Sequence, residues 1–490
     1  MRLAGGVRIL DRPSMLNIRR LDSNSMPWVE AASYYGIQVD PDHFTKLTKE
    51  LTDEMESLTA DVQKMVGEYC NLDSPEQVSN LLFKKLKLKQ ARRKMTKSGD
   101  REAADSEVLD AIKHDHEVIP LILDYKEASK LNGTYCKPII ELAKKAPDGT
   151  YRLYPNFKYT RIPTGRFACE EPNLLAIPAH GRLIVICGHC GLKLREFDKK
   201  PELPQFLKAH PRCPSNPQPF KFASRKWSER LRAGFITRSG WVLITCDLSQ
   251  IEPRVAAHRS NCEALIKVYL NDEDLYSDFA ITAFHLEDSR YRDEKGKWKY
   301  PHVDKEEHRF PAKTCTLASL YDVTGSGLLA QMPVGKGWTE NKCQDLINSF
   351  YLKYPELLRM RKIDHARARQ KEMVWDLFGR VLHTPGVKSV LPWVVSSTLR
   401  ELANHPIQGT ACGVLKLCMA ETHQIWEQAR LQEVIHPLLP IHDELLYEVR
   451  EDLAEEWIGM IQSVMERSLP MLVPIKASGG SAKNWGLLDK

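Results

Sequence analysis

The stretch Trp241-Val-Leu-Ile-Thr-Cys-Asp247-Leu-Ser-Gln-Ile-Glu252 carries an aspartate at the end of an apolar run. The apolar block that begins at Val242 is typical of a short buried strand. A carboxylate that leaves such a strand is costly to bury unless it is paired or bound to a metal. A solvated turn is the commoner place for a lone aspartate, so this stretch alone leaves both interpretations open.

A second stretch, Leu438-Leu-Pro-Ile-His442-Asp443-Glu444-Leu-Leu-Tyr-Glu-Val449, repeats the pattern far along the chain. Asp443 stands between two apolar runs, which predicts the corner of a hairpin, although a solvated turn is again the simpler alternative. Only the fold can bring Asp247 and Asp443 together. If it does, two carboxylates at strand ends can hold a pair of divalent cations.

Between them lies Arg309-Phe-Pro-Ala-Lys313-Thr-Cys-Thr-Leu317-Ala-Ser-Leu-Tyr321, whose four numbered residues recur every four positions and therefore share one helix face. Pro311 predicts that the helix starts there or just before. Free N–H groups and the positive end of the helix dipole would then lie beside Arg309 and Lys313, where they favour a phosphate. The alternative is a surface Arg–Lys pair followed by core residues. With the two carboxylates, a triphosphate cradle is favoured, and the combination is what in-line phosphoryl transfer requires.

These stretches resemble motifs A, B and C of family A DNA polymerases, the DNA polymerase I-like group. Asp247–Glu252 is similar to motif A, Arg309–Tyr321 to motif B and His442–Glu444 to motif C, in the family's order. The resemblance runs from about Asp40 to the closing Lys483-Asn-Trp485-Gly. It implies an α+β right-hand polymerase fold with palm, fingers and thumb. It also implies template-directed extension of a primer with dNTPs by two-metal-ion nucleotidyl transfer.

The resemblance implies roles for individual residues. Asp247 and Asp443 would bind two catalytic Mg2+ ions, with the carbonyl of Leu248 as a further ligand, and Lys313 would stabilise the leaving pyrophosphate. The implied nucleotide-binding residues are Arg309, Lys313, Glu252, Leu317, Tyr321 and Gln250.

Glu252 matches the position that blocks a 2′-hydroxyl, which favours dNTPs, although its place at a helix start also suits a capping carboxylate. Tyr321 would pack at the template-base pocket. Two residues depart from the family pattern, because Leu317 stands where an aromatic is usual and Asp322 where glycine commonly follows the tyrosine. Sugar discrimination and helix mobility are therefore the least transferable properties.

Other segments resemble parts of the family that contact primer and template. Thr164-Gly165-Arg166 and Asn173 match the palm edge, whereas Leu175 and Ala176 replace polar residues usual there. Residues 397–411 resemble the helix that leads into motif C. The DNA-binding residues implied by these matches are Arg166, Asn173, Arg400, Asn404, Gln408 and His442.

The segment from Lys84 to Lys97 places eight cations in fourteen residues. A solvated helix end and loop is one interpretation. The other is the basic tip of the thumb, which would contact DNA phosphates without reading sequence. The cations assigned to DNA there are Lys84, Lys85, Lys87, Arg92 and Arg93.

Residues from about Ala179 to Lys226 do not fit the family and are predicted to be an insertion. They contain Cys187-Gly-His-Cys190 and His210-Pro-Arg-Cys213. Thiolates and imidazole in pairs at this spacing favour one structural, tetrahedral Zn2+. A redox CxxC motif and two unrelated pairs are the alternatives, and His189 or His180 could substitute as a ligand.

We divide the chain into seven segments. They are an N-terminal extension (1–35), thumb (36–150), palm edge (151–178), zinc-binding insertion (179–229), palm with motif A (230–255), fingers (256–375) and palm with motif C (376–490). Too few residues precede the thumb for a proofreading 3′–5′ exonuclease domain, so we expect this chain to copy DNA without proofreading.

The net charge of +6 permits a nucleic-acid partner without requiring one. The expected partners are primer-template DNA, dNTPs and replication proteins, with the chain acting as a monomer. No apolar run reaches the ~20 residues of a membrane span, and no secretory signal is visible. Cysteines such as Cys246, Cys315, Cys412 and Cys418 are expected to be buried free thiols in a reducing compartment. We therefore expect a cytoplasmic protein of a bacterial cell or phage-infected host, with organellar targeting left open.

Two classes of alternative remain. A single-subunit RNA polymerase or a reverse transcriptase would share this chemistry, but Glu252 argues against rNTPs. A non-catalytic DNA-binding replisome scaffold could keep the fold without the reaction, but Asp247, Lys313 and Asp443 argue against that.

Overall fold

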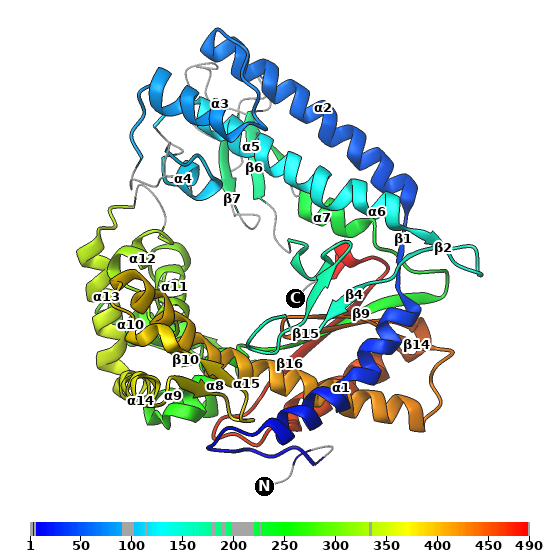
Figure 1. The fold of residues 1–490 in the computed structure, drawn as a ribbon, viewed down its shortest axis with the longest axis vertical. Coiled ribbons are helices and arrows are strands. Elements are labelled where there is room, and N and C mark those ends of the chain that lie inside the picture. The colour runs from blue at the N-terminus through cyan, green and yellow to red at the C-terminus, as the bar shows by residue number, and fades with distance from the viewer. Residues whose placement is uncertain are drawn as a thin grey trace.

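The structure, a computed structural model, consists of three lobes around the centre of Figure 1. It describes residues 3, 6–90, 102–112, 115–159, 161–178, 182–187, 193–197, 220–225, 227–332 and 336–488. We call the three parts the upper lobe, the side lobe and the sheet lobe.

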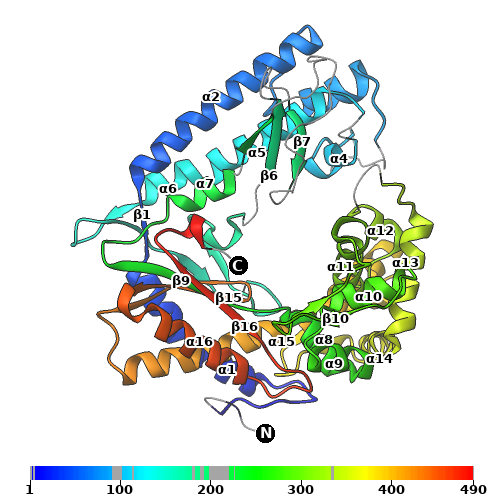
Figure 2. The same ribbon diagram turned by 180° about the vertical axis from the view of Figure 1, so that it is seen from behind.

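The sheet lobe is built on one four-stranded antiparallel sheet with the order β14-β15-β9-β16. Its strands are β9 (Trp241–Leu248), β14 (Ile435–Ile441), β15 (Glu444–Arg450) and β16 (Ala477–Ala482). Residues 242–246 of β9 are all buried, because helices pack on the sheet and neighbouring strands flank β9 on both sides. Both views show β16 lying along the edge of this sheet (Figure 2).

Three helices pack against the sheet or run along it: α1 (Met15–Tyr35), α15 (Pro392–Gln428) and α16 (Ala454–Arg467). Helix α1 lies within residues 1–35, yet Leu21 and Trp28 are buried in the same core as the sheet. The indole Nε1 of Trp28 donates a hydrogen bond to the hydroxyl of Tyr447 on β15, at 2.6 Å. The first helix is therefore integral to the core of the sheet lobe.

The upper lobe is helical and has a core of its own, which includes Leu58, Val62, Leu82 and Ile122. Its helices are α2 (Pro41–Val66), α3 (Pro75–Ser79), α4 (Ser106–Ala111), α5 (Val118–Leu131) and α6 (Lys137–Leu142), with π-helical turns at Asn80–Lys85 and Asn132–Cys136. Helix α3 is capped at its start, because the side chain of Ser74 accepts a hydrogen bond from the N–H of Gln77 and Pro75 occupies the first turn.

The side lobe contains most of the helices between the two aspartate strands. They are α8 (Ile251–Ser260), α9 (Glu263–Leu270), α10 (Leu275–Ala283), α11 (Phe310–Leu320), α12 (Gly325–Leu329), α13 (Glu340–Lys353) and α14 (Pro355–Lys371), with a π-helical turn at Lys305–Arg309. The hairpins of this region are β10 (Tyr291–Arg292) with β11 (Trp298–Lys299), and β12 (Met373–Trp375) with β13 (Val381–His383).

The other elements outside the three groups above are short. They are β1 (Ile37–Val39), β2 (Lys144–Lys145), β3 (Tyr151–Leu153), β4 (Asn156–Lys158), β5 (Ala168–Glu170), helix α7 (Trp227–Ala233) and the 3-10 turns Leu174–Ala176, Pro385–Lys388, Glu451–Leu453 and Trp485–Leu487. A separate antiparallel sheet with the order β7-β6-β8 consists of β6 (Arg182–Cys187), β7 (Lys193–Phe197) and β8 (Phe220–Arg225).

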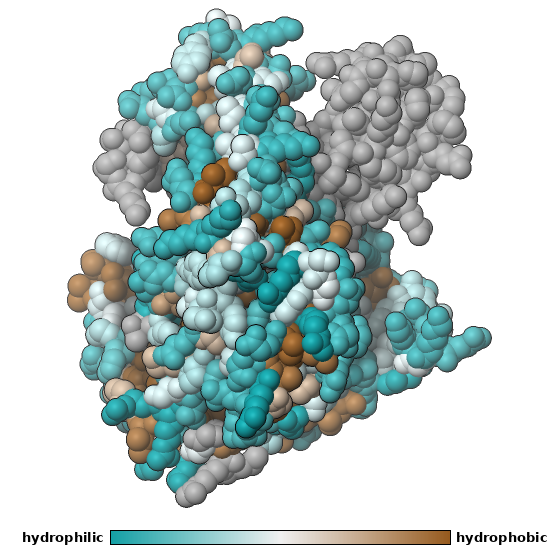
Figure 3. All heavy atoms as spheres, turned by 90° about the vertical axis from the view of Figure 1, so that its right-hand side faces the viewer, coloured by the Kyte–Doolittle hydropathy of each residue, from teal (hydrophilic) through white to brown (hydrophobic). Residues whose placement is uncertain are grey.

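The face shown in Figure 3 is mainly hydrophilic, and its hydrophobic residues form small groups. Such scattered exposure is ordinary for a folded protein. Within the described residues, no helix is both long enough and apolar enough to cross a bilayer.

Candidate functional site

The two aspartates lie at the same end of neighbouring strands. Asp247 is the penultimate residue of β9 and pairs with Glu444, the first residue of β15. Asp443 lies in the tight turn that joins β14 to β15. The N–H of Leu248 donates a hydrogen bond to the carbonyl of Asp443 at 3.1 Å. The hairpin corner predicted at Asp443 is therefore confirmed. The pairing of β9 with β15 brings Asp247 close to this turn, which the sequence alone could not establish.

The turn itself has a special backbone. His442 has a φ of +56°, a left-handed conformation that is uncommon outside glycine but comparatively enriched for histidine. His442 is exposed, whereas Glu444 is buried and accepts a hydrogen bond from the hydroxyl of Thr245. The turn is thus anchored on one side by a buried carboxylate and open on the other.

Arg166 links three distant segments of the chain. Its Nη2 lies 2.5 Å from Oε1 of Glu252 and 4.0 Å from Oδ1 of Asp443. The preceding Gly165 has a φ of +81°, and a Cβ there would lie 2.6 Å from Cζ of Arg380. The positive φ favours glycine, and a larger residue would also displace the guanidinium of Arg380. The Thr164-Gly165-Arg166 loop thus positions Arg166 beside both predicted motifs.

Glu252 lies in the first turn of α8 and is paired with Arg166. Burial raises the pKa of Glu252, and the charge and hydrogen bond of Arg166 oppose that rise. The pair is therefore only partly screened by water, so the position of one side chain depends on the other.

Arg309 is held by a residue that the sequence analysis missed. Its Nε and Nη2 donate to the two carboxylate oxygens of Asp274 at 2.7 and 2.9 Å. Asp274 also caps α10 by accepting from the N–H of Ser277 at 3.0 Å. Burial alone would raise the pKa of Asp274, but the hydrogen bonds from Arg309 and Ser277 hold it below its usual value. The only sequence signal was an aspartate at the N-cap of a helix.

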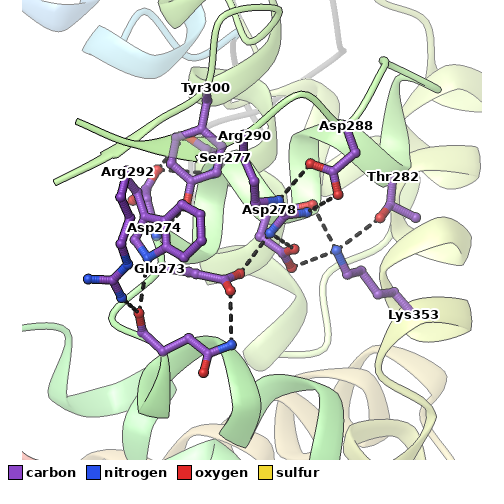
Figure 4. Close-up of polar contacts among 12 residues, drawn as sticks. Glu273, Asp274, Ser277, Asp278, Thr282, Asp288, Arg290, Arg292, Tyr300 and Lys353 are labelled. Atoms are coloured by element: carbon purple, nitrogen blue, oxygen red, sulfur yellow. Dashed lines mark hydrogen bonds and ion pairs between the residues drawn. The ribbon is translucent and has the colours of Figure 1, made fainter. Parts of the chain in front are cut away.

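Asp274 belongs to a wider polar network, part of which Figure 4 draws. Arg290 contacts Oε2 of Glu273 at 2.7 Å and Oδ1 of Asp278 at 2.8 Å. Lys353 contacts Oδ2 of Asp278 at 2.6 Å. The network ties α10 to α13 and to the segment that precedes β10. The N–H of Asp274 donates a hydrogen bond to the hydroxyl of Tyr300 at 2.9 Å, which fixes the position of the partner of Arg309.

Tyr276 is the second residue missed. Its ring centre lies 5.3 Å from Cζ of Arg309 and 5.8 Å from Nζ of Lys313. Burial, chiefly, raises the pKa of Tyr276 to about 12, so the ring is neutral and offers its face to both cations. Lys313 itself is exposed.

The predicted free helix start beside Arg309 and Lys313 is wrong. Helical structure begins at Lys305, in the π-helical turn, and the carboxylate of Asp304 accepts from the N–H groups of Glu306 and Glu307 at 2.7 Å each. The helix continues past Pro311 because proline sits in the first turn of α11, where its missing N–H costs little. The positive end of the dipole therefore lies more than a turn upstream and is already capped.

The structure shows the surroundings of Leu317 and Asp322, the two residues that depart from the family pattern, and of the neighbouring Tyr321. Leu317 is half-buried on α11, and the hydroxyl of Tyr321 is buried with no hydrogen-bond partner among the described residues. Asp322 has a φ of +58°, so it adopts a conformation that glycine adopts freely. It pairs with Arg361 at 2.5 Å, and Arg361 also donates to the hydroxyl of Tyr351 at 2.8 Å. The aspartate thus adds an ion pair between the end of α11 and α14.

The remaining predicted DNA contacts fall in two places. Arg400, Asn404 and Gln408 lie on α15, and Asn173 is exposed just before the 3-10 turn that begins at Leu174. In the upper lobe, Lys84, Lys85 and Lys87 are exposed, and Lys85 pairs with Glu68 at 2.9 Å. Arg92 and Arg93 lie outside the described residues. The structure therefore brings Arg166 to Glu252 and Asp443 but does not bring the upper-lobe lysines there.

The predicted zinc ligands fall mostly outside the described residues. These are Cys190, His210 and Cys213, and of Cys187 only the backbone, at the end of β6, is described. Among the described residues, no group of three or more His, Cys, Asp or Glu side chains is arranged to hold a metal ion. The other cysteines that the structure describes in full, including Cys246, Cys315, Cys412 and Cys418, are buried free thiols.

Known proteins share this sequence and fold. The pattern of DNA polymerase family A matches residues 41–487. The thermostable DNA polymerase I of Thermus filiformis is 29% identical over 451 residues, which are 92% of this chain and 46% of that protein. DNA polymerase I of Caldicellulosiruptor bescii is 27% identical over 453 residues, which are 92% of this chain and 45% of that protein. The chain therefore spans less than half the length of these relatives.

Among solved structures, the POL domain of Pol1 from M. smegmatis, in complex with DNA primer-template and dNTP, has a TM-score of 0.75. The two sequences are 24% identical, and the matched region covers 96% of this chain and 73% of the M. smegmatis chain. The likeness confirms the predicted mixture of helix and sheet as the polymerase fold. Because the family pattern covers nearly the whole chain, the chain belongs to DNA polymerase family A.

Proposed function

We propose that the protein is a DNA-directed DNA polymerase that extends a primer on a DNA template with dNTPs. The observation that carries this is the meeting of Asp247, the turn at Asp443 and the Arg166–Glu252 pair at one end of the sheet. The relatives named DNA polymerase I, and the similar fold found with primer-template and dNTP, support it. They do not favour an RNA polymerase, a reverse transcriptase or a non-catalytic scaffold.

The catalytic metal would be Mg2+, held by the carboxylates of Asp247 and Asp443 and the carbonyl of Leu248. All three donors are oxygens, and they are few, which suits a cation that keeps water and substrate phosphate oxygens as its other ligands. When bound, two such ions activate a primer 3′-hydroxyl and stabilise the charge on the leaving pyrophosphate.

The triphosphate would lie against Arg309 and Lys313. Asp274 orients the guanidinium of Arg309, and the ring of Tyr276 supports both cations, so neither needs to be ordered when the nucleotide binds. Lys313 would stabilise the leaving group. Glu252 would exclude a 2′-hydroxyl. The remaining residues proposed for the nucleotide pocket are Gln250, Leu317 and Tyr321.

The DNA would contact the residues that the sequence resemblance assigns to DNA binding. Arg166, Asn173, His442 and the face of α15 would contact the duplex near the aspartates, and the basic segment of the upper lobe would contact its phosphates farther away. On this basis the sheet lobe is the palm, the side lobe the fingers and the upper lobe the thumb. The seven segment boundaries given from the sequence remain part of the proposal.

We further propose that residues 179–229 bind one structural zinc ion through Cys187, Cys190, His210 and Cys213. The strand pairing supports this, because β6 and β8 are antiparallel and Cys187 pairs with Phe220. Cys187 ends β6 and Phe220 begins β8, so the segments outside these two residues leave the small sheet at the same end of its strands. Those two stretches contain the other three ligands.

The reaction is tested by primer extension with purified protein. Asp247→Ala and Asp443→Ala should each lower the single-turnover rate by at least ~10³-fold, because each removes a metal ligand, while duplex binding persists. Asp345→Ala, an exposed aspartate on α13, is the matched control. Parallel reactions with rNTPs and with an RNA template separate the alternative polymerases. Extension by either variant within tenfold of the wild-type rate would contradict the assignment.

A further inference from the structure

The start of α15 exposes an unusual apolar group. Val390 is 94% exposed, Leu391 40% and Trp393 66%. The other tryptophans of the chain are buried or half-buried. A large aromatic side chain left in water next to two aliphatic ones is the kind of patch that marks a binding surface.

This group is held in place by its neighbours. Pro392 occupies the first turn of α15, and a small core that includes Val387 and Leu402 lies beneath it. Lys388 and Glu372 form an ion pair across the same corner, at 2.5 Å. The apolar group at the start of α15 therefore has a fixed position in the fold.

Trp393 lies on the same face of α15 as the residues proposed to contact DNA. The stripe consists of Trp393, Ser397, Arg400, Asn404 and Gln408, at helical spacings of four, three, four and four residues. Arg400 is exposed and Asn404 and Gln408 are half-buried, whereas Thr398, Leu402 and His405 beside them are buried. The stripe thus lies on the side of this stretch that faces away from the core, which also includes the exposed Glu401 beside Arg400.

The chemistry changes along the stripe. With a rise of ~1.5 Å per residue, Trp393 lies ~10 Å beyond Arg400 and ~22 Å beyond Gln408. The distance from Trp393 to Gln408 is about six to seven nucleotides at ~3.4 Å per nucleotide of one strand. The inner positions carry amides and a cation, which suit a paired duplex, and none of the five is a carboxylate. The outer position carries an aromatic face, which can stack on an unpaired base, whereas the bases inside a duplex are already stacked on both faces.

We propose that Trp393 stacks on an unpaired base of the template strand, several nucleotides from the aspartates, with Val390 and Leu391 flanking the contact. The proposal rests on the proposed polymerase function, because that function puts DNA on α15. It extends the DNA contact of α15 from the duplex to the single-stranded template.

The test compares two DNA substrates by fluorescence anisotropy. One is a primer-template with a ten-nucleotide 5′ template overhang, and the other is the same duplex with a blunt end. Trp393→Ala should raise the Kd for the overhang substrate by about 5- to 150-fold, the loss associated with one base–aromatic stack, and leave the Kd for the blunt duplex unchanged. Trp393→Phe should retain most of the affinity. Tyr34→Ala, which removes a 77% exposed aromatic on α1, is the matched control.

Each other outcome overturns the proposal. An equal loss on both substrates would make Trp393 a duplex contact or a structural residue, and no loss would remove it from the DNA path. A dimer that Trp393→Ala dissociates in sedimentation would make the patch an interface between copies. Single-nucleotide extension on a one-nucleotide overhang tests the proposed polymerase function separately. If the wild-type protein does not extend this substrate, the polymerase function is contradicted. If Trp393→Ala extends it at the wild-type rate but binds the long overhang more weakly, both the polymerase function and the stacking contact are supported.

Discussion

At the scale of single residues, two buried titratable groups surround the backbone of Arg380 and are shifted in opposite directions. Asp376 accepts from the N–H groups of Phe378 and Arg380 at 2.9 Å each. His405 contacts the carbonyl of Arg380 at 3.0 Å. Burial, chiefly, raises the pKa of Asp376 to about 6 and lowers the pKa of His405 to about 4. The Phe378–Arg380 turn beside the Gly165 loop is therefore held by an uncharged pair at intermediate pH.

These shifts make opposite contributions to the dependence of stability on pH. The pKa of Asp376 is raised from 3.8, so the folded state binds its proton more tightly and its contribution falls as pH rises from about 4 to 6. The pKa of His405 is lowered from 6.5, so its contribution rises from about pH 4 to 6.5. Each amounts to ~3 kcal/mol at most, and in the wild type they largely cancel.

Asp376→Asn should remove the first contribution and expose the second. We expect its unfolding free energy, measured by urea denaturation between pH 4 and 6.5, to rise with pH more steeply than that of the wild type. The slope is the readout, because the substitution also changes stability at every pH. Asp345→Ala should keep the wild-type slope. Parallel curves for Asp376→Asn and the wild type would show that Asp376 is not protonated in the folded protein near pH 5.

Residue types and spacing predicted the features that depend on local order. The hairpin corner at Asp443 and the strand that ends near Asp247 each follow from a few adjacent residues. Asp274 and Tyr276 were missed, because Arg309 lies 35 residues beyond Asp274 and only the packing of α10 against α11 brings them together.

At the scale of elements, the sequence predicted helices more reliably than their ends. The four-residue spacing from Arg309 to Tyr321 indicated the helix now seen as α11, and this helix begins at Phe310, just before Pro311, as expected. The expected free N–H groups at that start were wrong. A π-helical turn extends the helix upstream, and Asp304 caps that turn through i to i+2 and i+3 contacts that no periodicity encodes. Helix α14 likewise ends at Lys371, where Glu372 adopts a left-handed conformation just before β12 begins.

The β6–β8 sheet gives the zinc proposal a direct test. Metal analysis of protein purified without chelator should find about one zinc ion per chain, because the proposed ligand set of three thiolates and one imidazole binds zinc tightly. Cys187→Ser should lose that zinc, whereas Cys70→Ser, a buried thiol of the upper lobe, should retain it. Zinc-free protein, or a disulfide between Cys187 and Cys190 found by mass spectrometry, would rule the site out.

At the scale of the whole molecule, one carboxylate of the first helix joins segments from opposite ends of the chain. Oδ1 of Asp22 lies 2.7 Å from Nζ of Lys416, which is 0% exposed, and 2.6 Å from Nη2 of Arg380. Arg380 in turn packs against Gly165. Asp22 precedes residues 41–487, where the family pattern matches, so the resemblance that identified the site residues did not reach it.

Asp22→Ala should destabilise the protein by ~3–5 kcal/mol, because it leaves the buried ammonium of Lys416 without a counter-charge. Denaturant unfolding measures this. Glu30→Ala, an exposed carboxylate on the same helix, is the control and should change little. The double variant Asp22→Ala with Lys416→Met should recover much of the loss, since an apolar side chain needs no partner. A single variant as stable as the wild type would show that water reaches Lys416.

The pairing of β9 with β15 also decides which changes of length the chain can accept. Successive strand residues point to opposite faces of a sheet, so one residue inserted between Trp241 and Cys246 would turn Asp247 away from the hairpin at Asp443. A substitution along these strands changes the packing of one side chain, whereas a single insertion or deletion moves every following side chain of the strand to the opposite face of the sheet. Over evolutionary time, variation in length should therefore accumulate in the loops between lobes and be purged from these two strands.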